Sequence, residues 1–215
     1  MKIPISSFQS ELIIELNNDI IQSNLVECQK LRKVLFLVKL KVNDLKKHLK
    51  TYDQKDLIQL VTEIYKLNTE VQQFVSIKFL GEECIKMAFE KARKEIKDEF
   101  FPSRGDGSLR LVKAKKAIRD FKKLTSDQDK TLDLKLYYVE MGSKFTNTYG
   151  DIDSGFYDSM ITMFKDVVEA CDKDEEFFNK YNERLLKVVN ESEGIGWGYS
   201  DCINDYYYSI EWLDN

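Results

Sequence analysis

The sequence is poor in residues that interrupt helices. Its 215 residues include only two prolines and nine glycines. Proline breaks the interior of a helix and glycine weakens it, so this scarcity leaves room for several long helices. The strict alternation of apolar and polar residues that marks a half-buried strand is also missing. These absences predict an all-α protein without a β-sheet.

Residues for common catalytic and metal sites are equally scarce. His48 is the only histidine, and it lies among lysines without a neighbouring serine or cysteine that it could activate. The four cysteines lie far apart, so neither a C-x-x-C zinc motif nor a redox motif is present. We therefore expect no cofactor, a cytoplasmic protein, and reduced thiols at Cys28, Cys84, Cys171 and Cys202.

Long apolar runs are missing as well. The longest aliphatic and aromatic run near the amino terminus is Val34–Val38, whereas a membrane-spanning helix needs about 20 apolar residues. Charged and amide side chains interrupt the apolar residues of 1–26, which does not fit the layout of a signal peptide. The sequence therefore predicts no membrane partner.

Charged residues are abundant and unevenly distributed. Hydrophobic residues make up 43% of the chain and charged residues 33%, a composition typical of a globular protein. Residues 1–150 carry 28 basic and 21 acidic residues, whereas residues 151–215 carry 5 basic and 16 acidic ones. This asymmetry predicts either an anionic partner for the first part or ion pairing between the two parts. We favour the pairing, because charge asymmetry alone is a weak indicator of a partner.

Apolar residues recur at helical spacing along most of the chain. One long helix is expected to end near Phe101, because Pro102 disfavours helical geometry in the residue before it. The segment Ser103–Ser108 is rich in turn-forming residues and predicts a loop. Ser108 can cap the next helix, which is predicted over Leu109–Leu124.

The segment Leu132–Cys171 is predicted to form a helical hairpin at the centre of the protein. Its first arm is apolar nearly all round, which is typical of a helix buried on several sides. Gly142 is expected to stop this arm, and either Asp151 or Asp153 is expected to cap the second. The second arm carries two adjacent apolar stripes, so it can contact two neighbouring helices.

Together these patterns predict a compact or slightly solenoidal array of antiparallel helix pairs. Residues 1–38 are expected to be an N-terminal helical extension, and residues 39–215 a helical domain. Gly194–Gly198 is expected to stop one helix and start the last, with Trp197 and Tyr199 packed into the core.

Seven segments stand out in chain order: Glu99–Gly105, Lys113–Lys123, Tyr137–Glu140, Phe145–Asn147, Gly150–Asp153, Phe156–Tyr157 and Gly194–Gly198. Through them the chain resembles a family of bacterial all-helical proteins that is described only as a domain of unknown function. The resemblance extends over roughly residues 40–210, and residues 1–38 lie outside it. It implies an all-helical fold but no reaction, ligand or catalytic residue.

The strongest candidate for a binding surface is the basic segment Arg104–Lys123. It holds eight Lys or Arg residues and two acids, Asp106 and Asp120. A basic helix can lie along a phosphate backbone, where neutralised phosphates release counterions. No base-reading motif is present, so such binding would tolerate many sequences. The alternative is a solvated face, or a face docked on the acidic C-terminal helices. The candidate nucleic-acid-binding residues are Arg104, Arg110, Lys113, Lys116, Arg119 and Lys123.

A second indication of nucleic-acid binding is weaker. Two short helices predicted over Val42–Leu67 resemble a SAP-type helix pair, but Tyr52–Lys55 stands where such motifs carry a glycine. An isolated motif match of this kind is often false.

Four acidic residues lie around the turn of the predicted hairpin. Carboxylate oxygens of this kind can hold magnesium or calcium. The spacing does not fit a calcium-binding loop, because the glycine and the final glutamate of that motif are not in place. Helix capping explains one of the aspartates without a metal. The candidate metal ligands are Glu140, Asp151, Asp153 and Asp158.

The sequence predicts many amphipathic helices but shows no cluster of residues that is typical of an active site. This combination favours a non-enzymatic protein–protein interaction or adaptor module. Its partner would be another protein or a second copy of the chain, with residues 1–38 as an added contact surface. The alternative is a sequence-tolerant nucleic-acid-associated protein that uses the basic helix. A third hypothesis is a carboxylate–metal hydrolase built on the four acids.

Overall fold

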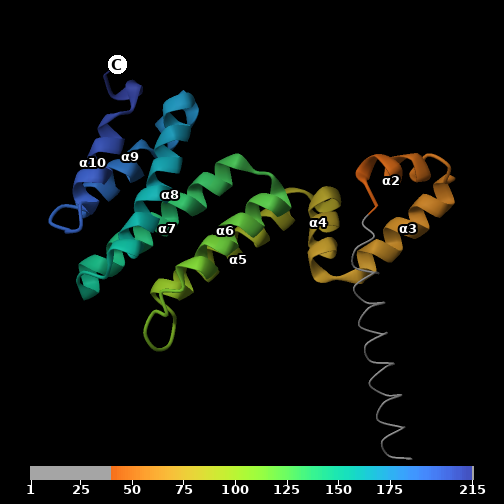
Figure 1. Ribbon diagram of the computed structural model, residues 1–215, viewed down its shortest axis with the longest axis horizontal. Coiled ribbons are helices and arrows are strands. Elements are labelled where there is room, and N and C mark those ends of the chain that lie inside the picture. The colour runs from red at the N-terminus through yellow and green to blue at the C-terminus, as the bar shows by residue number, and fades with distance from the viewer. Residues whose placement is uncertain (1–39, 215) are drawn as a thin grey trace, which may run out of the picture. The chain divides into compact units, whose positions relative to one another are not determined.

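The structure is a computed structural model that describes residues 40–214 (Figure 1). This part of the chain is helical and contains no β-strand, which confirms the predicted fold class. The predicted N-terminal extension and Cys28 lie outside the described residues. The elements are α2 (Val42–Leu49), α3 (Gln54–Leu67), α4 (Thr69–Leu80), α5 (Glu82–Phe100), α6 (Leu111–Thr125), α7 (Gln128–Tyr149), α8 (Ser154–Lys173), α9 (Glu175–Glu191), α10 (Tyr199–Tyr208) and a short 3-10 helix, η1 (Glu211–Asp214).

The chain divides into two compact units, Met1–Glu63 and Ile64–Asn215. The described part of the first unit contains α2 and most of α3, in the two-helix arrangement that was predicted for this stretch. Asp53 precedes α3, and its Oδ1 accepts a hydrogen bond of 2.8 Å from the backbone N–H of Asp56. The predicted domain boundary after residue 38 lies outside the described residues and stays a prediction.

In the second unit, α7 is the central helix. It packs against α5, α6, α8 and α9, and successive long helices run in opposite directions (Figure 1). Eleven of its residues are buried, on more than one face. Complete burial of an aliphatic side chain stabilises the fold by about 1.5–3 kcal/mol, and Leu134, Leu136 and Val139 on α7 are all completely buried. The predicted central hairpin of Leu132–Cys171 is therefore confirmed in α7 and α8.

The predicted stop at Gly142 is wrong, because α7 continues to Tyr149. Gly142 has helical neighbours on both sides, and a Cβ atom at this position would overlap the Sδ atom of Met160 on α8. The glycine is thus required for the close approach of α7 and α8. The helix instead ends at Gly150, whose positive φ of 91° favours glycine.

The capping prediction for α8 is confirmed for one of its two alternatives. Asp153 Oδ1 accepts a hydrogen bond of 2.9 Å from the backbone N–H of Phe156. Asp151 instead accepts a hydrogen bond of 3.0 Å from the hydroxyl of Tyr157. Only Asp153 therefore satisfies a free amide at the beginning of the helix.

The loop between α5 and α6 folds back onto the end of α5. As predicted, α5 ends at Phe100 before Pro102. The predicted cap at Ser108 is wrong, because α6 begins only at Leu111. Leu109 has a positive φ of 48°, and its N–H donates to the carbonyl of Glu99 at 2.9 Å. This long-range hydrogen bond delays the start of α6.

Buried hydroxyl groups in the core are paired with one another. The hydroxyls of Tyr138 and Ser159 lie 2.8 Å apart, and those of Ser143 and Tyr199 lie 2.7 Å apart. Every buried side-chain nitrogen and oxygen in the described range has a hydrogen-bond partner. Burial raises the pKa of Tyr138 to about 12, although the hydrogen bond with Ser159 partly opposes this effect. These hydroxyls therefore stay protonated and serve to join α7 to α8 and α10.

Candidate functional site

The helix α6 separates its apolar and basic residues onto two faces. Its buried residues are Ala114, Ala117, Ile118 and Phe121. Most of its lysines and arginines are exposed to solvent. Because α6 packs mainly on α4, α5 and α7, its basic face is not covered by the acidic C-terminal helices.

Two of the candidate nucleic-acid-binding residues are held by a buried glutamate. Arg110 Nε donates to Glu99 Oε2 at 3.0 Å, and Arg110 Nη2 donates to Glu99 Oε1 at 3.2 Å. Lys113 Nζ lies 2.7 Å from the same Oε1 atom. We call these three residues the Glu99 cluster. It joins the end of α5 to the beginning of α6.

The members of the Glu99 cluster differ strongly in exposure. The side chain of Glu99 is 1% exposed, whereas those of Arg110 and Lys113 are 61% and 51% exposed. Burial alone would raise the pKa of Glu99, but hydrogen bonds and charges from Arg110 and Lys113 outweigh it and lower the pKa below its usual 4.5. Glu99 is therefore ionised near neutral pH.

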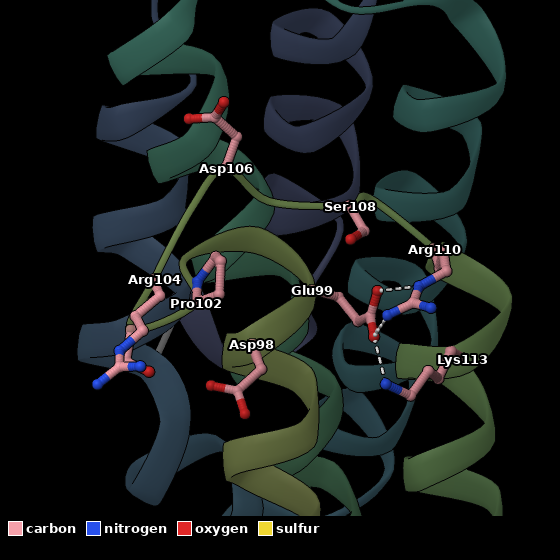
Figure 2. A pocket seen from close by; sticks show the side chains of 9 residues that line it. Asp98, Glu99, Pro102, Arg104, Asp106, Ser108, Arg110 and Lys113 are labelled. Carbon is pink, nitrogen blue, oxygen red and sulfur yellow. Dashed lines mark hydrogen bonds and ion pairs between the residues drawn. The ribbon is translucent and has the colours of Figure 1, made fainter.

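A pocket of about 280 Å³ lies between the end of α5, the following loop and the beginning of α6. Figure 2 shows Glu99, Arg110 and Lys113 converging on one side of it, with Ser108 above them. Arg104 and Asp106 point away from this group (Figure 2). Arg104 therefore lines the same pocket as Arg110 and Lys113 but does not belong to the Glu99 cluster.

The remaining candidate residues lie farther along α6. Lys116 Nζ forms an ion pair with Asp120 Oδ2 at 2.5 Å. Within residues 40–214, Arg119 and Lys123 have no ion pair. Their positive charges are therefore not neutralised by this part of the chain.

The ion pairs between residues 1–150 and 151–215 differ from the expected pattern. Within residues 40–214, only Lys135 and Asp166, 2.6 Å apart, join a base of the first part to an acid of the second. The other pairs join an acid of α7 to Lys180 or Arg184 of α9. Ion pairing between the two parts is thus present, but most of these pairs join an acid of the first part to a base of the second, the reverse of what the net charges of the parts suggest.

Arg184 of α9 forms ion pairs with two acids of α7. Its Nε and Nη2 atoms donate to the two oxygens of Glu140 at 2.7 and 3.0 Å, and its Nη1 donates to Asp133 at 2.8 Å. We call Asp133, Glu140 and Arg184 the Arg184 cluster. Burial alone would lower the pKa of Arg184, but the two carboxylates outweigh it and raise the pKa.

The four candidate metal ligands are not brought together. Glu140 belongs to the Arg184 cluster, Asp151 accepts from Tyr157, and Asp153 caps α8. Asp158 is exposed on α8. No group of three or more His, Cys, Asp or Glu residues is placed to hold a metal ion within residues 40–214. Metal binding there stays a prediction that these positions do not support.

The segment Gly194–Gly198 connects α9 to α10, as predicted. Tyr199 is buried and donates or accepts a hydrogen bond with Ser143, but Trp197 is 59% exposed. The prediction that Trp197 packs into the core is therefore wrong. Trp197 and Gly198 have φ values of 60° and 69°, and α10 begins directly after these two left-handed residues. Ile195 and Tyr199 provide the buried contacts instead.

The helices α2 and α3 have no buried residue. Apolar residues recur at helical spacing along α3, and several of their side chains are exposed to solvent. Ile58, Val61 and Ile64 are 61%, 50% and 41% exposed. The helical spacing of apolar residues in a sequence does not distinguish a covered stripe from an uncovered one.

Glu99 and Arg184 were not among the predicted site residues. A signal for Glu99 was present, because it follows Ala92 and Ile96 on the inward face of α5. A charged residue on an apolar stripe predicts a buried ion pair. No comparable local signal marked Arg184, whose partners are 44 and 51 residues away.

The fold and these surfaces define an all-α protein built from antiparallel helix pairs. Among the helices of residues 40–214, none is both long and apolar enough to span a membrane. The model of a family of unknown function, DUF6155, matches residues 40–209, and the chain belongs to this family. No curated protein and no solved structure shows a significant match to the chain.

Proposed function

We propose that the protein is a non-enzymatic helical interaction module that associates with a second copy of itself through α3. The observation that carries the proposal is the exposed apolar stripe of α3, which no described residue buries. Exposed contiguous apolar surface is typical of protein–protein interfaces.

The helices α2 and α3 would gain stability if their apolar side chains were covered. Isolated helices shorter than about 12–15 residues are marginal in water, and α2 and α3 have 8 and 14 residues. Burial of a Val or Ile side chain stabilises a structure by about 1.5–3 kcal/mol. Covering Ile58, Val61 and Ile64 would therefore supply stability that these helices lack on their own.

A second copy fits this surface because each copy presents the same stripe. In a twofold interface, one patch covers its identical counterpart, so the apolar residues of both copies would leave water together. The residues beside the stripe carry both signs of charge, including Lys55, Glu63 and Lys66. Such a mixed rim permits opposite charges to face one another across a twofold axis.

The molecular mass in solution tests this proposal. We expect the full chain to elute as a dimer in size-exclusion chromatography with light scattering, and Val61→Glu to convert it to a monomer. Gln59→Glu is the matched control, since it adds the same charge to an exposed position of α3 outside the stripe. A monomeric wild type, or equal loss of the dimer in both variants, would contradict the proposal.

Nucleic-acid binding by α6 is a second candidate function. It is supported by the ion-pair pattern, because the described ion pairs leave Arg119, Lys122 and Lys123 without a counterion. Binding of this kind would depend on phosphate contacts and hence on salt.

Fluorescence anisotropy with labelled single-stranded DNA across a salt series tests the second candidate. Lys122→Gln/Lys123→Gln should reduce the log–log salt slope by roughly 0.7 for each lost phosphate contact. Lys86→Gln/Lys97→Gln on α5 removes the same charge from another surface and should leave the slope unchanged. No binding by the wild type at low salt would exclude this candidate.

A further inference from the structure

We propose that Ser108, Arg110 and Lys113 bind the phosphate group of a small phosphorylated molecule, with Glu99 as a positioning residue. The pocket between α5, the following loop and α6 would hold this group (Figure 2). The inference goes beyond the proposed function, because it depends on neither the stripe of α3 nor a partner protein.

The two cationic groups converge because they share one oxygen of Glu99. Lys113 Nζ and Arg110 Nη2 lie 2.7 and 3.2 Å from Glu99 Oε1. Glu99 is nearly inaccessible, so it fixes both cations from the protein side. The two cationic side chains stay more than half exposed on the other side. A ligand approaching from solvent would therefore meet both cations at once.

Both cations retain donors that Glu99 does not use. A guanidinium has five N–H donors and an ammonium has three. Arg110 donates two hydrogen bonds to Glu99, and the ammonium of Lys113 contacts one oxygen of Glu99. The hydroxyl of Ser108 adds a further donor beside them (Figure 2). Phosphate oxygens accept charge-assisted hydrogen bonds from groups of this kind.

The charge facing this part of the pocket is positive. Glu99 contributes one negative charge against the two positive charges of Arg110 and Lys113. Of the other acids in the lining, Asp98 is paired with Lys94 and Asp106 points away from the cluster (Figure 2). One further anion would therefore complete the charge balance of the Glu99 cluster.

The shape of the site favours a small ligand over a nucleic-acid strand. The pocket volume of about 280 Å³ lies near the lower limit of the roughly 300–1,000 Å³ of small-molecule sites. Its cations converge on one point, whereas a strand requires cations distributed along its backbone. A phosphomonoester of a few carbon atoms matches both features.

Isothermal titration with inorganic phosphate, glycerol 3-phosphate and a single-stranded oligonucleotide lacking terminal phosphates tests the proposal. We expect saturable binding of the two small anions by the full chain. Ser108→Asp should weaken it at least tenfold, because the new carboxylate repels the ligand or occupies its place. Ser126→Asp at the other end of α6 is the matched control and should change binding less than twofold.

Ser108→Asp leaves the hydrogen bonds of Glu99 in place, so it tests the pocket without removing the cations that hold this buried acid. Urea unfolding checks that both variants are folded. The proposal is overturned if neither small anion binds saturably, or if the two serine variants lose binding equally. It is also overturned if only the oligonucleotide binds and Ser108→Asp abolishes that binding. Val61→Glu on α3 should retain phosphate binding, which separates this test from the test of self-association.

Discussion

The Glu99 cluster and the Arg184 cluster each join two helices, but the charges within them are arranged in opposite ways. In the first, one buried anion holds two exposed cations. In the second, one cation that is 30% exposed holds two anions that are 26% and 19% exposed. Each cluster is therefore centred on the single opposite charge, but only in the Glu99 cluster is this central charge more buried than its partners.

This difference explains why ion pairing does not remove the charge asymmetry of the chain. The Arg184 cluster uses an arginine from the acidic second part and two acids from the basic first part. Such pairs use the less frequent charge of each part, which is the acids of residues 1–150 and the bases of residues 151–215. The more frequent charges of each part therefore stay on the surface. The basic face of α6 is one result, and the acidic surface of the C-terminal helices is the other.

The largest expected effect comes from removing the outer charges of the Glu99 cluster. Arg110→Gln/Lys113→Gln leaves a buried carboxylate without a cation, and we expect a loss of about 3 kcal/mol in the free energy of unfolding at pH 7. Urea unfolding followed by tryptophan fluorescence measures this loss, because both tryptophans, Trp197 and Trp212, lie in the second unit.

The matched control for this variant is Lys122→Gln/Lys123→Gln, which removes two cations from the same helix. Because these lysines are exposed, we expect a change of at most about 0.5 kcal/mol. Equal losses in the two double variants would show that the Glu99 cluster contributes nothing beyond net charge.

A smaller effect is expected at the centre of the Arg184 cluster. Arg184→Gln leaves Asp133 and Glu140 without their shared cation, but solvent reaches both acids in part. We therefore expect a loss of about 2 kcal/mol at pH 7. The same urea experiment measures it. A loss no larger than that of Asp133→Asn would contradict a central role for Arg184.

Removing the centre of the Glu99 cluster should cost less. Glu99→Gln leaves two cations that are already more than half exposed, so we expect a loss of about 1 kcal/mol at pH 7. The folded-state pKa of Glu99 is below 4.5. Its stabilisation is therefore complete above pH 4.5 and is lost as the pH falls through the folded-state pKa.

Unfolding curves between pH 7 and pH 3 check this dependence. Wild type and Glu99→Gln should differ most near neutrality and converge in acid. Asp129, whose pKa is lowered by Lys180 and Tyr181 against the opposing effect of burial, should retain its own acid dependence in both proteins. Parallel curves over the whole range would contradict an ionised, stabilising Glu99.

The smallest effect is expected at the edge of the Arg184 cluster. Asp133→Asn removes one carboxylate but leaves the two hydrogen bonds between Arg184 and Glu140. We expect a loss of about 0.5 kcal/mol, in the range of a partly exposed ion pair. Thermal unfolding of wild type and variant side by side measures it, and a loss as large as that of Arg184→Gln would show that Asp133 is the principal partner.

Local patterns predicted the helices well and their closest contacts poorly. The scarcity of proline and the helical spacing of apolar residues predicted the fold class, because both act within one or two turns of a helix. Gly142 was misassigned because a glycine that ends a helix and one that admits a neighbouring helix look alike in sequence. Ser108 was misassigned because the hydrogen bond between Leu109 and Glu99 shifts the start of α6.

For the candidate surfaces too, the sequence predicted features within one helix but not contacts between distant residues. The basic face of α6 follows from the sequence alone, since residue spacing determines which side chains share a helix face. The convergence of Arg110 and Lys113 on Glu99 depends on how the loop returns to α5. The Arg184 cluster depends on the docking of α9 against α7 over 44 to 51 residues. Sequence thus determined which helices form and where their apolar residues lie. Tertiary structure alone decided which of those faces are buried and which charges meet, because burial and ion pairing require helices to dock at one particular register.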